Sequence, residues 1–222
     1  VGADVVEVTR GMGLDSRIGP RFLGAGLGWG GSCFPKDTAA LLALAGEYGY
    51  VMPITQAARE VNAQQRRIAV EKLQEALKVL RGRTIGVLGL AFKPGTDDIR
   101  ESPAIEIIRL LTERGAHVKA HDPVAVENAR RALADIEVEF VDDPYELAQG
   151  CDGIVLATEW DIYRALDLAK LAASMRLPVL VDGRNVYDPE EARKAGFTYL
   201  GIGRPVSHVE AERRPASAVM GA

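Results

Sequence analysis

Two hydrophobic patterns follow one another along the chain. Between residues 54 and 80, apolar side chains recur mostly every three or four positions, which is the spacing of an amphipathic helix. This stripe consists of Ile54, Ala57, Val61, Ile68, Leu73, Leu77 and Leu80. An earlier run of helix formers predicts a helix over 36–47, closed by Gly46, Gly49 and Pro53. We therefore expect residues 1–80 to be helical.

From residue 84 onwards, short apolar runs alternate with helical spacing. The apolar runs predict strands over 84–90, 117–123, 137–141, 153–158, 178–184 and 197–203. The segments between them predict helices over 102–115, 125–135, 143–150 and 161–175. The first of these helices has Ser102 as its N-cap, Pro103 at its first position and Gly115 at its end.

This alternation predicts an α/β fold, in which a helical region precedes a doubly wound, Rossmann-like parallel sheet. Ligands of such sheets bind beyond the carboxyl ends of the strands. That rule directs attention to residues 89–102, 121–123, 157–160 and 182–185. Periodicity is lost after Pro205, so we divide the chain into a helical region 1–80, a sheet domain 81–205 and a flexible tail 206–222.

Composition narrows the class of protein. The 222 residues are 47% hydrophobic and carry a formal net charge of −4, which argues against a nucleic-acid partner. No apolar run approaches the roughly 20 residues that span a membrane, and no signal peptide is visible. The two cysteines, Cys33 and Cys151, form no disulfide framework, so we expect free thiols and a cytoplasmic location. The chain begins without methionine, in what resembles a helix already under way, so we expect a fragment of a longer protein.

Cys33 has the sequence surroundings of a nucleophile. Five glycines between residues 24 and 31 precede it and allow a close approach of the backbone to a ligand. Cys33 then stands at a predicted helix start, with Pro35 in the first turn and Lys36 beside it, and both surroundings favour the thiolate. Asp37 lies one helical turn later, where a carboxylate can orient water or move a proton, although it also opposes the thiolate. Free cysteines are commonly buried and inert, so an inert thiol remains the alternative.

Other polar residues have both a functional and a structural interpretation. Taken alone, Lys93 and Arg100 can be solvated loop charges, but their place after the first strand favours a functional role, because two cations there suit a diphosphate. Asp122 follows the second strand, where it can meet a ribose hydroxyl or form an Asp-Pro turn. We expect Trp160 and Cys151 to serve packing.

Two further expectations concern metals and oligomers. The three histidines, His117, His121 and His208, have no ligand spacing, so we expect no metal site. The apolar stripe on 54–80 is expected to be buried, either against the core of the chain or against a partner subunit, and we favour a homodimer.

Two stretches carry a family resemblance. They are RIGPRFLGAGLGWGGSCFPKD (17–37) and GLAFKPGTDDIRESPA (89–104). Both resemble the UDP-glucose 6-dehydrogenase family, within the wider UDP-glucose/GDP-mannose dehydrogenases, and the resemblance extends from Val1 to about Pro205. The family's amino-terminal NAD-binding Rossmann domain has no counterpart here, and no G-x-G-x-x-G motif opens a βαβ unit.

The resemblance implies a chemistry for Cys33. It would attack the aldehyde formed by a first hydride transfer, and a second hydride transfer would then give a thioester that water hydrolyses to the acid. Asp37 would assist with the proton or the water. NAD would be the cofactor, held mainly by the missing domain, so this chain alone would bind a UDP-sugar without turning it over.

The resemblance also implies binding roles. Lys36 and Arg100 would face NAD, and Arg17 would reach the sugar across a dimer interface. The residues implied in substrate binding are Arg17, Phe22, Leu23, Gly24, Gly26, Gly28, Gly30, Gly31, Phe92, Lys93 and Arg184.

Two other functions stay open at the level of sequence. The chain is alternatively a nucleotide-sugar-binding or dimerisation module without catalysis. A cysteine hydrolase is a weaker alternative, since no histidine lies near Cys33 in sequence. The motifs favour UDP-glucose over GDP-mannose, and N-acetylated UDP-hexosamines remain alternatives.

Overall fold

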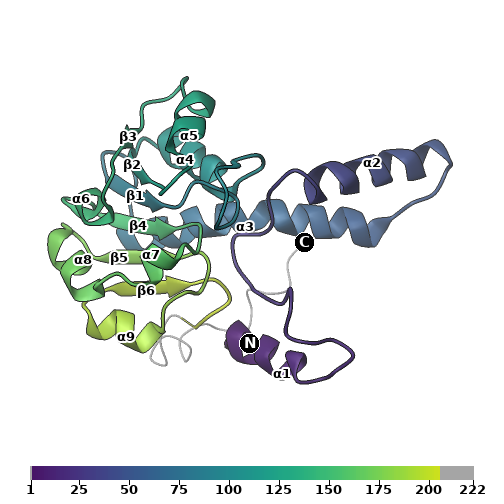
Figure 1. The fold of residues 1–222 in the computed structure, drawn as a ribbon, viewed down its shortest axis with the longest axis horizontal. Helices are drawn as coiled ribbons and strands as arrows, with labels where there is room; N and C mark the ends of the chain where they lie inside the picture. Colours follow the sequence, from purple (N-terminus) through teal and green to yellow (C-terminus); the bar gives the residue numbers. More distant parts are fainter. Residues whose placement is uncertain (1, 206–222) are drawn as a thin grey trace.

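A parallel β-sheet forms the centre of the molecule (Figure 1). The computed structural model describes residues 2–205, and within them the sheet has six strands in the order β3-β2-β1-β4-β5-β6. The strands are β1 (Thr84–Leu88), β2 (His117–His121), β3 (Glu139–Phe140), β4 (Gly153–Leu156), β5 (Val179–Asp182) and β6 (Thr198–Gly201). Every pairing is parallel, which confirms the predicted α/β class.

Helices cover both faces of this sheet. One face packs against α3 (Pro53–Leu77), α4 (Pro103–Glu113) and α5 (Val126–Ala132). The other face packs against α6 (Pro144–Ala148), α7 (Asp161–Arg164), α8 (Leu168–Ser174) and α9 (Pro189–Lys194). Strand order reverses between β1 and β4, and the chain segments beyond the carboxyl ends of these strands border the position where doubly wound sheets bind ligands.

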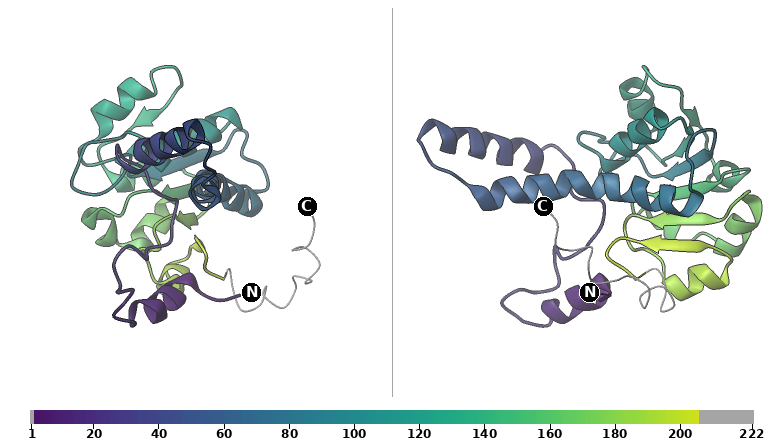
Figure 2. Two further views of the ribbon diagram at one scale, coloured as in Figure 1. Left: turned by 90° about the vertical axis from the view of Figure 1, so that its right-hand side faces the viewer. Right: turned by 180° about the vertical axis from the view of Figure 1, so that it is seen from behind.

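Two amino-terminal helices precede this domain. They are α1 (Val5–Gly13) and α2 (Phe34–Glu47). The N-terminal half of α3 extends beyond the sheet, and α2 lies along it (Figure 2). Asp4 caps α1 by accepting a hydrogen bond from the Val6 amide at 2.9 Å, so this helix starts inside the chain, contrary to our expectation of a helix already under way.

Within this chain, only the second half of the predicted stripe on α3 is buried. Ile54 is 85% exposed and Val61 is 53% exposed. The buried positions are Asn62, Arg66, Ala69, Val70, Leu73 and Leu77, so two polar residues continue the apolar stripe towards the amino terminus. Only the second half of α3 packs on the sheet.

Other boundaries also differ from the sequence prediction. The helix expected over 161–175 is two helices, because Asp167 caps α8 by accepting from the Lys170 amide. The helix α9 was not predicted. The helix expected to reach residue 80 ends at Leu77, where Lys78 adopts a φ of 66°. The predicted flexible tail, 206–222, lies outside the described residues, as does His208.

No helix in residues 2–205 is long and apolar enough to cross a membrane.

Candidate functional site

Cys33 occupies the N-cap of α2. Its thiol is exposed, and Pro35 lies in the first turn, as the sequence predicted. The Asp37 amide donates to the Cys33 carbonyl at 2.8 Å, which closes the first helical turn. The expectation that Cys33 starts a helix, with Asp37 one turn later, is therefore confirmed.

Two cations interact with Cys33: Lys36, three residues later in the sequence, and Arg100, from the segment beyond β1. The Lys36 ammonium lies 2.9 Å from Asp37, which raises the pKa of Lys36, and the charge of Cys33 adds a smaller increase. Asp98 raises the pKa of Arg100 through a hydrogen bond, and Cys33 again contributes to the increase. Lys36 and Arg100 therefore both lie close enough to Cys33 to interact with it electrostatically.

The glycine-rich run lies across the carboxyl edge of the sheet. The Leu27 amide donates to the Gly183 carbonyl at 3.1 Å, beyond β5, and the Gly31 amide donates to the Arg100 carbonyl at 2.8 Å, beyond β1. A Cβ atom on Gly30 would overlap the Glu101 carbonyl. These glycines thus permit close packing of the loop on the strand ends, and their contact with a ligand stays a prediction.

Arg184 is largely buried under the same loop. Its Nε atom donates to the Ala157 carbonyl at 2.8 Å, and its Nη1 atom donates to the Gly28 carbonyl at 3.2 Å. Burial lowers the pKa of Arg184, whereas Glu159, 3.4 Å away, opposes that decrease. The guanidinium therefore ties the glycine-rich run to the end of β4.

Phe92 and Lys93 follow β1 at this edge. The Lys93 ammonium lies 5.4 Å from the centroid of the Phe92 ring, which is within the range of a cation–π contact. The Phe92 ring in turn fills the space that a side chain on Gly31 would need. Lys93 is exposed, so its ammonium can meet an anion here. The structure thus gathers segments 26–37, 89–102 and 182–185 at one end of the sheet.

The segment that joins α1 to α2 carries the remaining candidates. Arg17 is paired with Asp15 at 2.6 Å, and its side chain is 87% exposed. Phe22 is fully exposed, with a φ of 63°. Leu23 is partly buried, and Gly24 has open space where a side chain would lie. The structure places these residues on the outside of this chain, and their roles stay predictions.

Asp122 serves the fold. One carboxylate oxygen accepts from the amides of Leu90 and Ala91 and from the indole N–H of Trp160, at 2.7, 3.1 and 3.1 Å. The other oxygen accepts from the amides of Val124 and Ala125. The turn interpretation of Asp122 is therefore correct, because protein donors take the place of a ribose hydroxyl. Trp160 packs between the two layers and anchors this carboxylate.

The second cysteine is inert. Cys151 is fully buried, and burial raises the pKa of its thiol to about 12. Its Sγ atom donates to the Leu147 carbonyl at 3.0 Å. Its expected packing role is confirmed. No cluster of three or more potential metal ligands occurs in residues 2–205.

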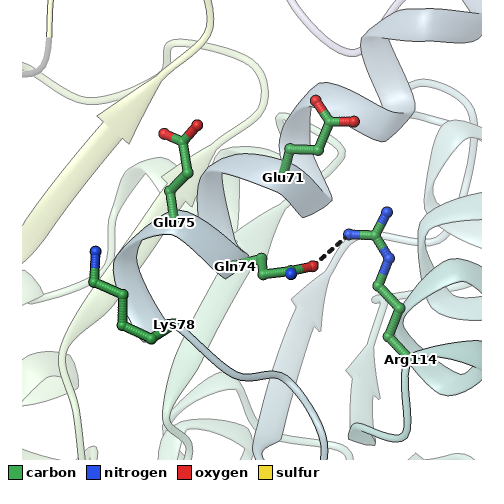
Figure 3. A pocket seen from close by; sticks show the side chains of 5 residues that line it. All are labelled: Glu71, Gln74, Glu75, Lys78 and Arg114. Atoms are coloured by element: carbon green, nitrogen blue, oxygen red, sulfur yellow. Dashed lines mark hydrogen bonds between the residues drawn. The ribbon is translucent and has the colours of Figure 1, made fainter.

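A separate hollow of about 450 Å³ opens at the C-terminal end of α3 (Figure 3). Its lining consists of Glu71, Gln74, Glu75, Lys78 and Arg114. Arg114 and Gln74 already bond one another at 2.9 Å. None of the predicted site residues lines it, and it holds no nucleophile. Most of the predicted site residues lie instead at the carboxyl edge of the sheet, with Cys33.

Sequence reasoning missed the polar residues that hold the Cys33 region in place. Arg59, Asn62 and Arg66 of α3 bond the backbone around Cys33 from 24 to 37 positions away in sequence. One signal was available, since Asn62 and Arg66 lie four residues apart and continue the spacing of Ala69 and Leu73.

Comparison with known sequences gives two matches to one family. The profile of the UDP-glucose/GDP-mannose dehydrogenase family, central domain, matches residues 1–64. The profile of the UDP binding domain of the same family matches residues 86–189.

Curated relatives and solved structures agree with these matches. A UDP-glucose 6-dehydrogenase of Bacillus subtilis is 47% identical over 92% of this chain and 44% of its own length, and one of Pseudomonas aeruginosa is 46% identical over 92% and 46%. The structure of a UDP-glucose dehydrogenase from Pyrobaculum islandicum aligns with a TM-score of 0.82 at 48% identity, over 91% of this chain and 44% of that chain. The structure of a UDP-D-ManNAc dehydrogenase from Pyrococcus horikoshii aligns with a TM-score of 0.77 at 28% identity, over 93% of this chain and 46% of that chain. The chain thus spans about half the length of the relatives it matches.

Proposed function

Because this chain belongs to the UDP-glucose/GDP-mannose dehydrogenase family, we propose that it carries the nucleophile and the nucleotide-sugar site of an NAD-dependent UDP-glucose 6-dehydrogenase. The observation that supports this most is the position of Cys33, exposed at the start of α2 and in electrostatic contact with Lys36 and Arg100. UDP-glucose is the proposed sugar, because three UDP-glucose relatives are 46–48% identical and the UDP-D-ManNAc relative is only 28% identical.

Cys33 performs the covalent step. Its thiolate sulfur bonds to the C6 aldehyde carbon, and the carbonyl oxygen takes up a proton to give a thiohemiacetal. Loss of a hydride and a proton from this adduct gives a thioester. Water then adds to the thioester carbon, the C–S bond breaks, and the products are the carboxylate, the free thiolate and two protons. NAD supplies the hydride acceptor for both oxidations when it is bound.

Asp37 assists the hydrolysis. It lies one turn after Cys33 and is held by Lys36, so its carboxylate faces the same end of α2 as the sulfur. From there it accepts the proton that water loses on attack.

The residues of this chain fit part of an NAD site. Lys36 and the Arg100 side chain are exposed near the sulfur and fit contacts with dinucleotide phosphates. Asp122 does not fit a ribose contact, because its oxygens already accept five protein N–H groups. We therefore propose that most of the NAD contacts come from residues outside this chain.

The UDP-sugar lies along the carboxyl edge in this proposal. Lys93, exposed beyond β1, pairs with the diphosphate, and Phe92 lines the sugar side. Arg184 supports the nucleotide end, mainly by fixing the loop that carries Gly28.

We also propose a homodimer in the cytoplasm. Apolar side chains stay exposed on α2 (Leu44), on the first half of α3 (Ile54) and in the segment between the two helices (Val51). A second copy that covers this surface also brings Arg17 to a neighbouring site. Two free thiols in the described residues suit a reducing compartment.

A thermal-shift series on this chain tests the substrate class. We expect UDP-glucose to raise the melting temperature more than UDP-N-acetylhexosamines, GDP-mannose or NAD do. The complete protein is then assayed for two NADH per UDP-glucose consumed. Stabilisation without NADH formation supports a binding module instead, and no stabilisation by any UDP-sugar contradicts the proposed site.

A further inference from the structure

We infer that Arg59, Asn62 and Arg66, on one face of α3, position the Cys33 loop (residues 28–35) by holding its backbone on both sides of the cysteine. They are positioning residues. The inference rests on the proposed function only in treating Cys33 as the nucleophile.

Asn62 binds the loop before Cys33. Its Oδ1 atom accepts from the Trp29 amide at 2.7 Å, and its Nδ2 atom donates to the Trp29 carbonyl at 3.1 Å. The side-chain amide thus pairs with the Trp29 backbone as a neighbouring strand would. Asn62 is 8% exposed, so both bonds are shielded from water and their loss leaves buried groups unpaired.

Arg66 strengthens the same anchor. It lies one helical turn after Asn62, and its Nη2 atom donates to the Trp29 carbonyl at 3.2 Å. The same atom reaches the Glu101 carbonyl at 3.4 Å, and Nη1 pairs with Glu106 of α4. Arg66 therefore ties the Cys33 loop to the segment that carries Arg100.

The loop also has the backbone that this anchor requires. Gly28 adopts a φ of 85°, and a Cβ atom there would overlap Asn62 Oδ1. Only glycine combines this conformation with so close an approach to the helix.

Arg59 binds the loop after Cys33. Its Nη1 atom donates to the Pro35 carbonyl at 2.6 Å and to the Thr38 hydroxyl at 2.7 Å. Residues 59, 62 and 66 are three and four positions apart, so they share one face of α3. Cys33 lies between the two anchored points, Trp29 and Pro35.

These contacts fix the sulfur relative to the sheet. The second half of α3 is embedded in the sheet core through Ala69, Val70 and Leu73. The same sheet carries Lys93 and Arg100 on the segment beyond β1. Helix α3 therefore holds Cys33 at a fixed position relative to Lys93 and Arg100. Precise placement of a nucleophile governs the rate of the chemical step.

The test compares Asn62→Ala and Arg59→Ala with Gln64→Ala and Arg67→Ala, which alter exposed neighbours on α3. The sequence has two tryptophans, Trp29 and Trp160, so a ¹H–¹⁵N spectrum shows two indole signals. We expect Asn62→Ala to shift or broaden the Trp29 signal and to leave the Trp160 signal in place. Asn62→Asp keeps the acceptor for the Trp29 amide but sets a carboxylate oxygen against the Trp29 carbonyl, so it is also expected to shift the Trp29 signal.

Kinetics of the complete protein supply the second measurement. We expect kcat for nucleotide-sugar oxidation to fall about tenfold or more in Asn62→Ala and Arg59→Ala, with KM changed less than about threefold. Arg59→Lys, which keeps a donor for Pro35, is expected to restore most of kcat. Neither control changes kcat.

The spectrum and the kinetics test separate parts of the inference. An unchanged Trp29 signal in folded Asn62→Ala overturns the anchor whether or not the protein oxidises nucleotide sugars. A displaced Trp29 with unchanged kcat overturns the positioning of the nucleophile. If Asn62→Ala does not fold, Arg59→Ala and Arg59→Lys remain as the test. Equal kcat values in Arg59→Ala and in the wild type then contradict the inference. Absence of turnover in the wild-type protein contradicts only the proposed function.

Discussion

Two cysteines in one chain show how surroundings decide reactivity. Cys33 is exposed at a helix start near Lys36 and Arg100, whereas Cys151 is fully buried and bonded to a carbonyl. The sequence predicted that Cys33 starts a helix, because glycines precede it and Pro35 lies in the first turn, and that Cys151 begins a buried strand. It could not choose between a nucleophile and an inert thiol for Cys33, since Arg100 reaches it only through the fold.

This contrast predicts selective labelling. At pH 8 in the folded chain we expect a thiol reagent to modify one cysteine, Cys33, because burial raises the pKa of Cys151 to about 12. In urea both thiols react. Peptide mass spectrometry that finds Cys151 labelled in the folded chain contradicts this assignment of the two environments.

Asp122 gives a second prediction at this scale. Asp122→Asn replaces a carboxylate that accepts five N–H groups with an amide whose NH₂ group faces donors. We expect the free energy of unfolding to fall by about 2–4 kcal/mol in urea denaturation. Asp161→Asn, at an exposed position, is the control and should change it by less than about 0.5 kcal/mol. Equal stability of the two variants would show that the network around Asp122 contributes little.

Among the elements, α3 differs most from its sequence prediction. Three- and four-residue spacing located the helix correctly, and Pro53 at its start was read as the end of the preceding segment. The same pattern did not identify Asn62 and Arg66 as buried, because hydropathy treats both side chains as solvated. They are buried since their hydrogen-bond partners come from the Cys33 loop, 33 to 37 residues away. A local hydrophobic pattern cannot predict hydrogen-bond partners that lie so far away in the sequence.

The two halves of α3 should therefore respond differently to truncation. Leu73→Ala removes a fully buried side chain from the sheet core and should cost about 2–5 kcal/mol of unfolding free energy. Ile54→Ala removes an exposed side chain and should cost less than about 0.5 kcal/mol in the monomeric chain. Chemical denaturation of both variants at low protein concentration measures this, and similar losses would contradict the burial along the helix.

At the scale of the whole molecule, the sheet brings distant segments to one edge. Alternating patterns predicted the parallel sheet and directed attention to the strand ends, where the candidate site lies. The way the Cys33 loop lies across β1 and β5 was not predictable, because its contacts join segments up to 156 residues apart and go mainly to backbone atoms, which carry no side-chain signature. Periodicity predicted the helices and strands, and the resemblance of two motifs to a known family predicted which residues form the site.

The location of the site predicts that substitutions of two lysines change the affinity for UDP-glucose differently. Lys93→Ala should weaken UDP-glucose binding about tenfold or more, because an exposed cation beyond β1 is lost from the diphosphate. Lys78→Ala, in the hollow at the other end of α3, should leave affinity unchanged. Isothermal titration calorimetry decides between them, and a larger loss in Lys78→Ala would move the site to that hollow.

The central claim is that the Cys33 sulfur forms the covalent bond to the sugar. The most direct measurement is UDP-glucuronate formation by the complete protein carrying Cys33→Ser, followed by NADH absorbance and product analysis. We predict that acid formation falls roughly a thousandfold or more while the melting temperature stays close to that of the wild type. Acid formation at the wild-type rate by the folded variant would contradict the account.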